Sequence, residues 1–118
     1  MFGNSLPEIT VRELAAKLNT FEHFVLLDVR EPWELEKARI TDNRFKNAPT
    51  SRLAREGLTA LPEAAKTKDA LIFVICHHGV RSADVTRWLA SQGWQAVFSV
   101  RGGIDAYANE IDKAVGFY

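Results

Sequence analysis

The residues with the clearest potential for chemistry are the heptapeptide CHHGVRS at 76–82, which holds the only cysteine of the chain. It follows a short apolar run, 71–75, whose β-branched residues predict a strand buried on both faces of a parallel sheet. It precedes a segment in which Val85, Trp88 and Leu89 recur at helical spacing. We therefore expect a strand, a tight loop and a helix to meet at Cys76.

This placement favours an anionic sulfur. Open α/β sheets bind ligands at the carboxyl ends of their strands, and a helix that starts there directs its unpaired N–H groups toward the same point. Helix N-termini and nearby cations lower cysteine pKa values to roughly 3.5–7.5. Cys76 is thus a candidate nucleophile. The alternative is a buried core cysteine, since free cysteine is among the most buried residue types.

Three motifs resemble those of the rhodanese-like sulfurtransferase family. CHHGVRS at 76–82 fits the C-x-x-G-x-R-S loop of that family, LDVRE at 27–31 is similar to its preceding strand and turn, and GGIDAY at 102–107 is similar to its entry to the last helix. The resemblance implies a single domain, residues 1–118, with a three-layer α/β/α fold around a central, mostly parallel sheet of about five strands. It also implies a cysteine that carries sulfur as a persulfide. We expect no cofactor.

The remaining pattern predicts alternating strands and helices. Thr10 and Glu13 form a capping box for a helix over 10–19, and residues 24–29 predict a second buried strand. The other predicted elements are an edge strand at 8–9, helices at 32–36, 61–65, 83–92 and 104–111, and a strand at 94–100. Residues 37–56 give a weaker pattern, in which 47–49 predict the end of a short strand that leads into a turn. Residues 38–43 depart from the Gly-His-Ile-x-Gly-Ala pattern usual in the family. The apolar tail, 115–118, is expected to fold back onto the body.

The length of the loop distinguishes two chemistries. Backbone N–H groups that point into a curled loop can hold an anion, and Gly79 supplies the positive φ that such curvature requires. Cysteine phosphatases, including those that resemble rhodaneses in fold, use C-x5-R, whereas Arg81 follows Cys76 with four residues between. The narrower ring suits one sulfur atom better than a phosphate.

Arg81 has two possible functions. It could bind an anionic donor such as thiosulfate, or it could pair with Asp28 or Glu31 and brace the loop against the neighbouring strand, which we favour. Ser82 is expected in the N-cap region of the helix, with a hydroxyl that could also reach the loop. Asp28, Arg30 and Glu31 match the family motif as residues at the rim of the site.

His77 and His78 complete the candidate binding loop, together with Gly79, Val80, Arg81 and Ser82. Either imidazole could bind substrate or become positively charged near its unperturbed pKa of ~6.5; the alternative is that both are exposed and without function. Because adjacent side chains in a tight loop are expected to diverge, and His23 is the only other histidine, we expect no metal site.

Composition limits the partners. Fifteen basic and fifteen acidic residues cancel, so the net charge suggests neither nucleic acid nor a membrane surface as a partner. No disulfide can form within the chain, and no stretch resembles a signal peptide or a membrane span, so we expect a cytoplasmic protein. Residues 37–56 hold six basic and two acidic side chains. They could attract an anionic donor or an acidic protein, or they could simply be a solvated surface.

Three functions are compatible with these residues. The first is an enzyme that moves sulfur from thiosulfate or a persulfide through Cys76 to cyanide, a thiol or a protein. The second is a persulfide relay with little free turnover that docks to a protein partner. The third, a binding module without activity, is disfavoured because the nucleophile is present.

Overall fold

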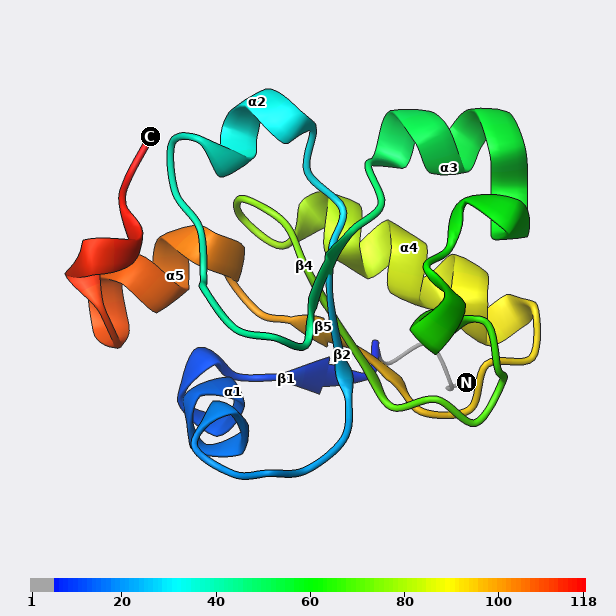
Figure 1. Cartoon of the computed structure of the whole chain (residues 1–118), viewed down its shortest axis with the longest axis horizontal. Coiled ribbons are helices and arrows are strands. Elements are labelled where there is room, and N and C mark those ends of the chain that lie inside the picture. The colour runs from blue at the N-terminus through cyan, green and yellow to red at the C-terminus, as the bar shows by residue number, and fades with distance from the viewer. Residues whose placement is uncertain (1–5) are drawn as a thin grey trace.

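The computed structural model describes residues 6–118, in which five strands form one all-parallel sheet (Figure 1). The spatial order is β1-β5-β4-β2-β3, and every neighbouring pair is parallel. The strands are β1 (Glu8–Ile9), β2 (Val25–Asp28), β3 (Phe45–Asn47), β4 (Ile72–Ile75) and β5 (Val97–Val100). The predicted α/β fold with a parallel sheet is confirmed. Residues 1–5, at the N-terminus where the sequence shows no signal-peptide pattern, lie outside the described residues.

Helices cover both faces of the sheet. They are α1 (Val11–Leu18), α2 (Pro32–Leu35), α3 (Thr50–Glu56), α4 (Val80–Ser91) and α5 (Gly103–Glu110), with 3-10 turns at Gly57–Ala60, Glu63–Ala65 and Lys113–Val115. Figure 1 shows α3 and α4 on one side of the sheet and α1 and α5 on the other.

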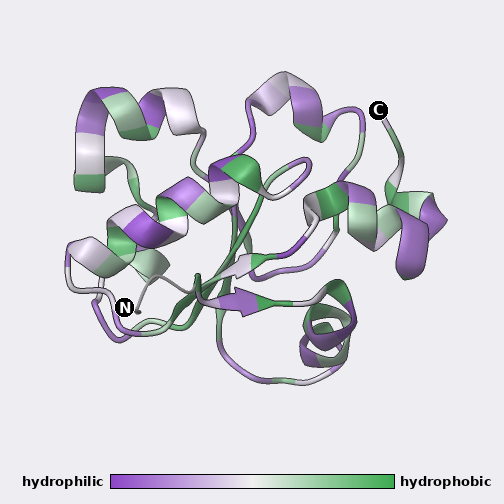
Figure 2. Ribbon diagram, turned by 180° about the vertical axis from the view of Figure 1, so that it is seen from behind, coloured by the Kyte–Doolittle hydropathy of each residue, from purple (hydrophilic) through white to green (hydrophobic). Residues whose placement is uncertain are grey.

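Alternate residues of the central strands β2 and β4 enter different cores. Leu27 and Val74 pack with α3 and α4, whereas Leu26 and Phe73 pack with α1 and α5. Because successive strand side chains point to opposite faces, a sheet covered on both sides needs continuous apolar runs, and these strands are largely green in Figure 2. All four residues of β2 and of β4 are buried.

Local signals predicted several boundaries correctly. The capping box at the start of α1 is present, with Glu13 N donating to Thr10 Oγ1 at 3.1 Å and Thr10 N donating to Glu13 Oε1 at 2.8 Å. Helix α4 ends at Ser91, and Gly93 follows with a φ of +104°. The short edge strand β1 and the helix that begins at Pro32 are also confirmed.

Two segments differ from expectation. Strand β5 begins at Val97, later than predicted, because the Trp94 indole packs in the core and donates to the Ala65 carbonyl at 2.9 Å. Helix α3 was not predicted, since Leu53 is its only buried residue and gives no apolar stripe.

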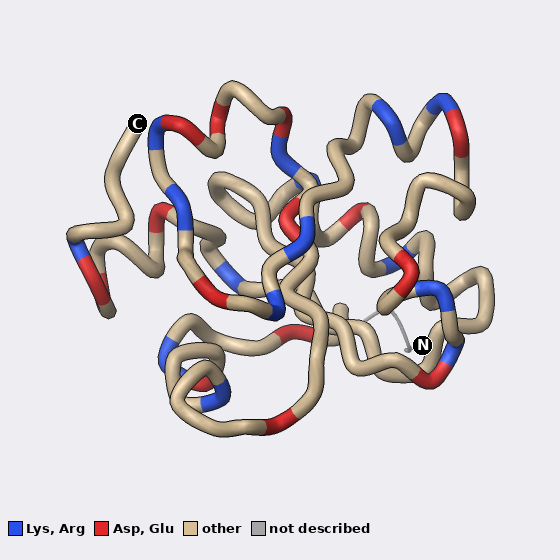
Figure 3. Tube along the Cα trace, viewed as in Figure 1, with Lys and Arg blue, Asp and Glu red and all other residues tan. Residues whose placement is uncertain are grey.

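The basic segment at 37–56 carries its own counter-charges, and Figure 3 shows acidic residues among the basic ones. Arg44 Nε lies 2.8 Å from Asp42 Oδ1, and Arg52 Nε lies 3.3 Å from Glu56 Oε1. The Arg44 guanidinium lowers the pKa of Asp42. In the part of the chain that the structure describes, no helix has both the length and the apolar character to cross a membrane.

Candidate active site

Cys76 directly follows β4, and two backbone amides converge on its sulfur. Gly79 N donates to Cys76 Sγ at 3.1 Å and Ser82 N donates to it at 3.3 Å. The thiol donates to the Ser82 hydroxyl at 3.5 Å, and Ser82 Oγ lies 2.9 Å from Ser99 Oγ. Cys76 is only 1% exposed. The thiol is therefore buried, but among inward-pointing hydrogen-bond donors as well as hydrocarbon.

The loop of residues 76–82, here called the cysteine loop, is shaped by glycine at its centre. Gly79 has a φ of +102° and is the N-cap of α4. The helix therefore begins at Val80. Ser82 was expected in the N-cap region, and it lies in the first turn of the helix. The Ser82 hydroxyl reaches the loop, as the sequence also allowed, and accepts from the Cys76 thiol.

Helix α5 follows β5, the strand next to β4, and its first amides bond to the cysteine loop. Ile104 N donates to the Cys76 carbonyl at 2.8 Å and Asp105 N donates to the His77 carbonyl at 3.1 Å. A Cβ on Gly103 would overlap both of these carbonyl groups. The second glycine of the GGIDAY motif thus permits the close approach of the helix N-terminus to the loop.

Arg81 pairs with a carboxylate of a neighbouring element, but this carboxylate is neither Asp28 nor Glu31, the two partners that we predicted. Its guanidinium forms two bonds with Glu34 of α2, at 2.7 Å to Oε2 and 2.9 Å to Oε1. This bidentate pairing raises the pKa of Arg81 and, against the opposing effect of burial, lowers the pKa of Glu34 to about 2. Helix α2 is therefore tied to the start of α4.

The predicted partners of Arg81 are occupied elsewhere. Asp28 accepts from the buried Arg30 guanidinium at 2.8 Å and 3.0 Å, and Glu31 accepts from the Ser51 hydroxyl at 2.7 Å. The three rim residues thus lie beside the cysteine loop without bonding to Arg81. Glu31 lies at the N-cap of α2, and its amide donates to Oε2 of Glu34 in that helix at 2.8 Å.

The tail folds back, as predicted, and reaches the site. Tyr118 Oη donates to Glu34 Oε1 at 2.9 Å and accepts from Arg30 Nη1 at 3.1 Å. The Tyr118 ring stacks on His77, with centroids 3.7 Å apart and planes inclined by 7°. Burial raises the pKa of Tyr118.

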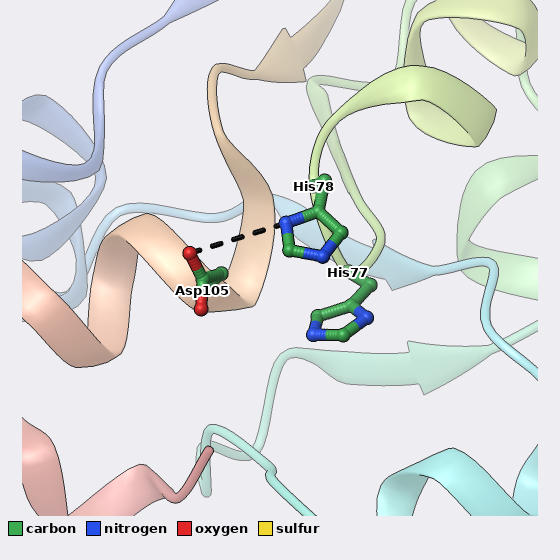
Figure 4. Close-up of side chains that lie close together, drawn as sticks. All are labelled: His77, His78 and Asp105. Atoms are coloured by element: carbon green, nitrogen blue, oxygen red, sulfur yellow. Dashed lines mark ion pairs between the residues drawn. The ribbon is translucent and has the colours of Figure 1, made fainter. Parts of the chain in front are cut away.

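His77 and His78 do not diverge, contrary to expectation. Their rings stack with centroids 3.8 Å apart, because Tyr118 packs against His77 and holds it beside its neighbour. Burial and the neighbouring His78 lower the pKa of His77. His78 is exposed, and its Nδ1 lies 3.9 Å from Asp105 Oδ2 (Figure 4).

The atoms of His77, His78 and Asp105 that could bind a metal lie within 4.8 Å of one another. Imidazole nitrogens bind metals in the plane of the ring, and the two rings are stacked with 27° between their planes. Their nitrogens therefore do not point to one common position. The expected lack of a metal site stays a prediction.

Sequence reasoning missed Glu34, Ser99 and Tyr118 as neighbours of the loop. Glu34 had one usable signal, since it lies three positions after Glu31, the spacing at which a helix side chain accepts from the N-cap amide, as it does here at 2.8 Å. Ser99 is a buried polar residue in an otherwise apolar strand. For Tyr118 the only signal was the apolar character of the tail, which predicted that the tail folds back but not what it contacts.

A parallel α/β sheet with a cysteine in an amide-lined, seven-residue loop at its carboxyl edge is typical of a rhodanese-type domain. The sequence profile described as Rhodanese-like domain matches residues 10–110. The chain belongs to this family.

Several relatives support the assignment. The chain is 33% identical over 107 residues to YtwF of Bacillus subtilis, named as a candidate sulfurtransferase, covering 89% of this chain and 93% of that protein. It is 32% identical over 82 residues to the thiosulfate sulfurtransferase GlpE of Vibrio cholerae, covering 70% of each. It is 34% identical over 116 residues to a chloroplastic rhodanese-like/PpiC domain-containing protein of Arabidopsis thaliana, but spans only 38% of that protein's length.

Solved structures share the fold. A rhodanese-like domain protein from Staphylococcus aureus aligns with a TM-score of 0.72 at 27% identity, covering 90% of this chain and 95% of that one. The yeast single-domain sulfurtransferase RDL2 of Saccharomyces cerevisiae aligns with a TM-score of 0.69 at 24% identity, covering 98% and 100%.

Proposed function

We propose that residues 1–118 form one rhodanese-like domain and that the protein is a sulfurtransferase with Cys76 as its nucleophile. The observation that supports this most directly is the convergence of the Gly79 and Ser82 amides on Cys76 Sγ. Fixed N–H donors around a sulfur stabilise the negative charge of both a thiolate and a persulfide. No cofactor is needed, because the electron pairs move only between sulfur atoms and the acceptor.

The proposed reaction has two displacements. The Cys76 thiolate attacks the outer sulfur of thiosulfate, the S–S bond of the donor breaks, and sulfite leaves with the electron pair. The enzyme then holds Cys–S–S⁻. Cyanide or a thiolate attacks the outer sulfur, and the cysteine thiolate is released while thiocyanate or a new persulfide forms. The relationship to GlpE supports thiosulfate as the donor to test first.

Arg81 is proposed to brace the loop rather than to bind the donor. Both of its terminal nitrogens are engaged by Glu34, so the donor anion would have to compete with a carboxylate at 2.7 Å. The exposed His78 is proposed to hydrogen-bond the donor at the mouth of the site.

Intact-mass measurement after incubation with thiosulfate tests the proposal. We expect one added sulfur atom, removed by cyanide or dithiothreitol. Cys76→Ser should take up no sulfur and produce no thiocyanate while its circular dichroism spectrum stays unchanged. Sulfur uptake or thiocyanate production by this variant at the wild-type rate would exclude Cys76 as the nucleophile.

A persulfide relay with a protein acceptor is the second candidate. The observation that favours it is the 1% exposure of Cys76, which shields the sulfur from free solutes until the loop moves or a partner docks. Comparing thiocyanate production with sulfur transfer to a protein thiol distinguishes the two. A relay should transfer sulfur to the protein much faster than to cyanide at equal concentration.

A further inference from the structure

Tyr118 contacts the cysteine loop at one end and is linked to its other end. Its ring stacks on His77, the residue that follows the cysteine, at 3.7 Å between centroids. Its hydroxyl donates to Glu34 Oε1 at 2.9 Å, and the same oxygen accepts from Arg81 Nη2 at 2.9 Å. One side chain is thus connected to the loop on both sides of Gly79.

The Tyr118 hydroxyl is fully engaged and well anchored. It donates to Glu34 and accepts from Arg30 Nη1 at 3.1 Å, and the Arg30 guanidinium is itself buried. The Arg30 guanidinium also lies over the tyrosine ring, 5.7 Å from its centroid. Arg30 and Glu34 lie within residues 10–110, which the family profile matches, whereas Tyr118 lies beyond them. The tail therefore contacts two residues of the matched domain through one side chain.

We propose that Tyr118 is a positioning residue, which holds the cysteine loop in the curvature that aims its amides at Cys76 Sγ. Helix α5 fixes the carbonyls of Cys76 and His77, and the side of the loop that faces α2 is held through Glu34 and the tyrosine. Donors that are fixed before the reaction stabilise the developing charge better than donors that must be ordered during it.

The test compares Tyr118→Leu, which loses the ring and the hydroxyl, with Tyr118→Phe, which keeps the ring. Phe117→Leu is the control, because Phe117 is the preceding residue and is 49% exposed. Two quantities are measured on the full chain: amide hydrogen exchange of residues 76–82, and the rate of persulfide formation at saturating thiosulfate. The first measurement does not depend on activity, whereas the second rests on the proposed function.

We expect Tyr118→Leu to accelerate exchange in the loop and to slow persulfide formation, each about tenfold, as for the loss of a hydrogen bond to a charged group. Tyr118→Phe should lie between this variant and wild type, and Phe117→Leu should match wild type. The thiosulfate concentration that gives half the maximal rate should change by less than about twofold, since the tyrosine positions the loop and does not bind the donor.

Wild-type exchange and wild-type rate in Tyr118→Leu would overturn the proposal. A raised half-saturating concentration with an unchanged maximal rate would also overturn it, because that result indicates donor binding. Equal losses in Phe117→Leu would overturn it as well, because the effect would then not be specific to Tyr118. If Tyr118→Leu does not fold, wild-type exchange in Tyr118→Phe overturns the proposal. If the wild-type protein takes up no sulfur, the proposed function fails, and the exchange comparison still decides the role of Tyr118.

Discussion

Replacing Glu34 with glutamine isolates the ion pair that ties α2 to the cysteine loop. The Glu34 side chain is 5% exposed and accepts two bonds from Arg81, at 2.7 and 2.9 Å. These contacts lower its pKa from 4.5 to about 2, which corresponds to about 3 kcal/mol in favour of the ionised form. The Arg81 side chain is 34% exposed, so solvent screening reduces this value, and we expect Glu34→Gln to lose about 2 kcal/mol at pH 7.

The stability lost in Glu34→Gln should depend on pH in a defined direction. The pKa of Glu34 is lower in the folded protein, so its contribution is complete above the ordinary value of 4.5 and disappears as the pH falls toward 2. Urea unfolding of both proteins between pH 7 and pH 2 measures the difference in unfolding free energy, which should shrink below about pH 5. Subtracting the variant from wild type removes the contribution of other carboxylates such as Asp42, whose pKa is also lowered.

Glu36→Gln is the matched control, because Glu36 is exposed and lies just beyond the same helix. Its unfolding free energy should stay within about 0.5 kcal/mol of wild type. A Glu34→Gln loss that is constant from pH 7 to pH 2, or that equals the loss in the control, would refute the assignment of the ion pair as the stabilising contact.

Three other changes test separate parts of the site. His77→Phe should flatten the rise of unfolding free energy with pH below about pH 6.5, because burial lowers the pKa of His77 and the unfolded chain binds the extra proton; urea unfolding on both sides of this pH measures the change. Gly103→Ala should lose at least about 2 kcal/mol more than Gly57→Ala in the same assay, since both have a positive φ but only Gly103 faces backbone carbonyls. Ser82→Ala should cost about 1–3 kcal/mol by leaving the buried Ser99 hydroxyl unpaired, yet it should still take up one sulfur by intact mass, because the Ser82 amide remains.

The parts of the site that are contiguous in the sequence could be predicted. The strand, the turn at Gly79 and the helix that follows lie within about twenty residues, and apolar periodicity and glycine placement determine them locally. The same holds for the capping box at Thr10 and for the alternation of strands and helices that gives the parallel sheet. The chemical roles of the loop residues stay predictions.

Contacts between distant segments could not be predicted. Glu34 and Arg81 are 47 residues apart, and Glu34 and Tyr118 are 84 residues apart. Three carboxylates, Asp28, Glu31 and Glu34, lay near the same predicted edge, and only the docked orientation of α2 decides which of them faces Arg81. The stacking of the two histidines depends in the same way on where the tail comes to rest.

The ends of the sheet have a consequence for aggregation. Its outermost strands, β1 and β3, are only two and three residues long, whereas β2, β4 and β5, of four residues each, lie inside. Short outer strands offer few free N–H and C=O groups to a strand from another molecule, and charged side chains there, Glu8 and Lys46, disfavour such pairing further. We expect the folded chain to resist edge-to-edge self-association at the concentrations needed for the sulfur-transfer assays.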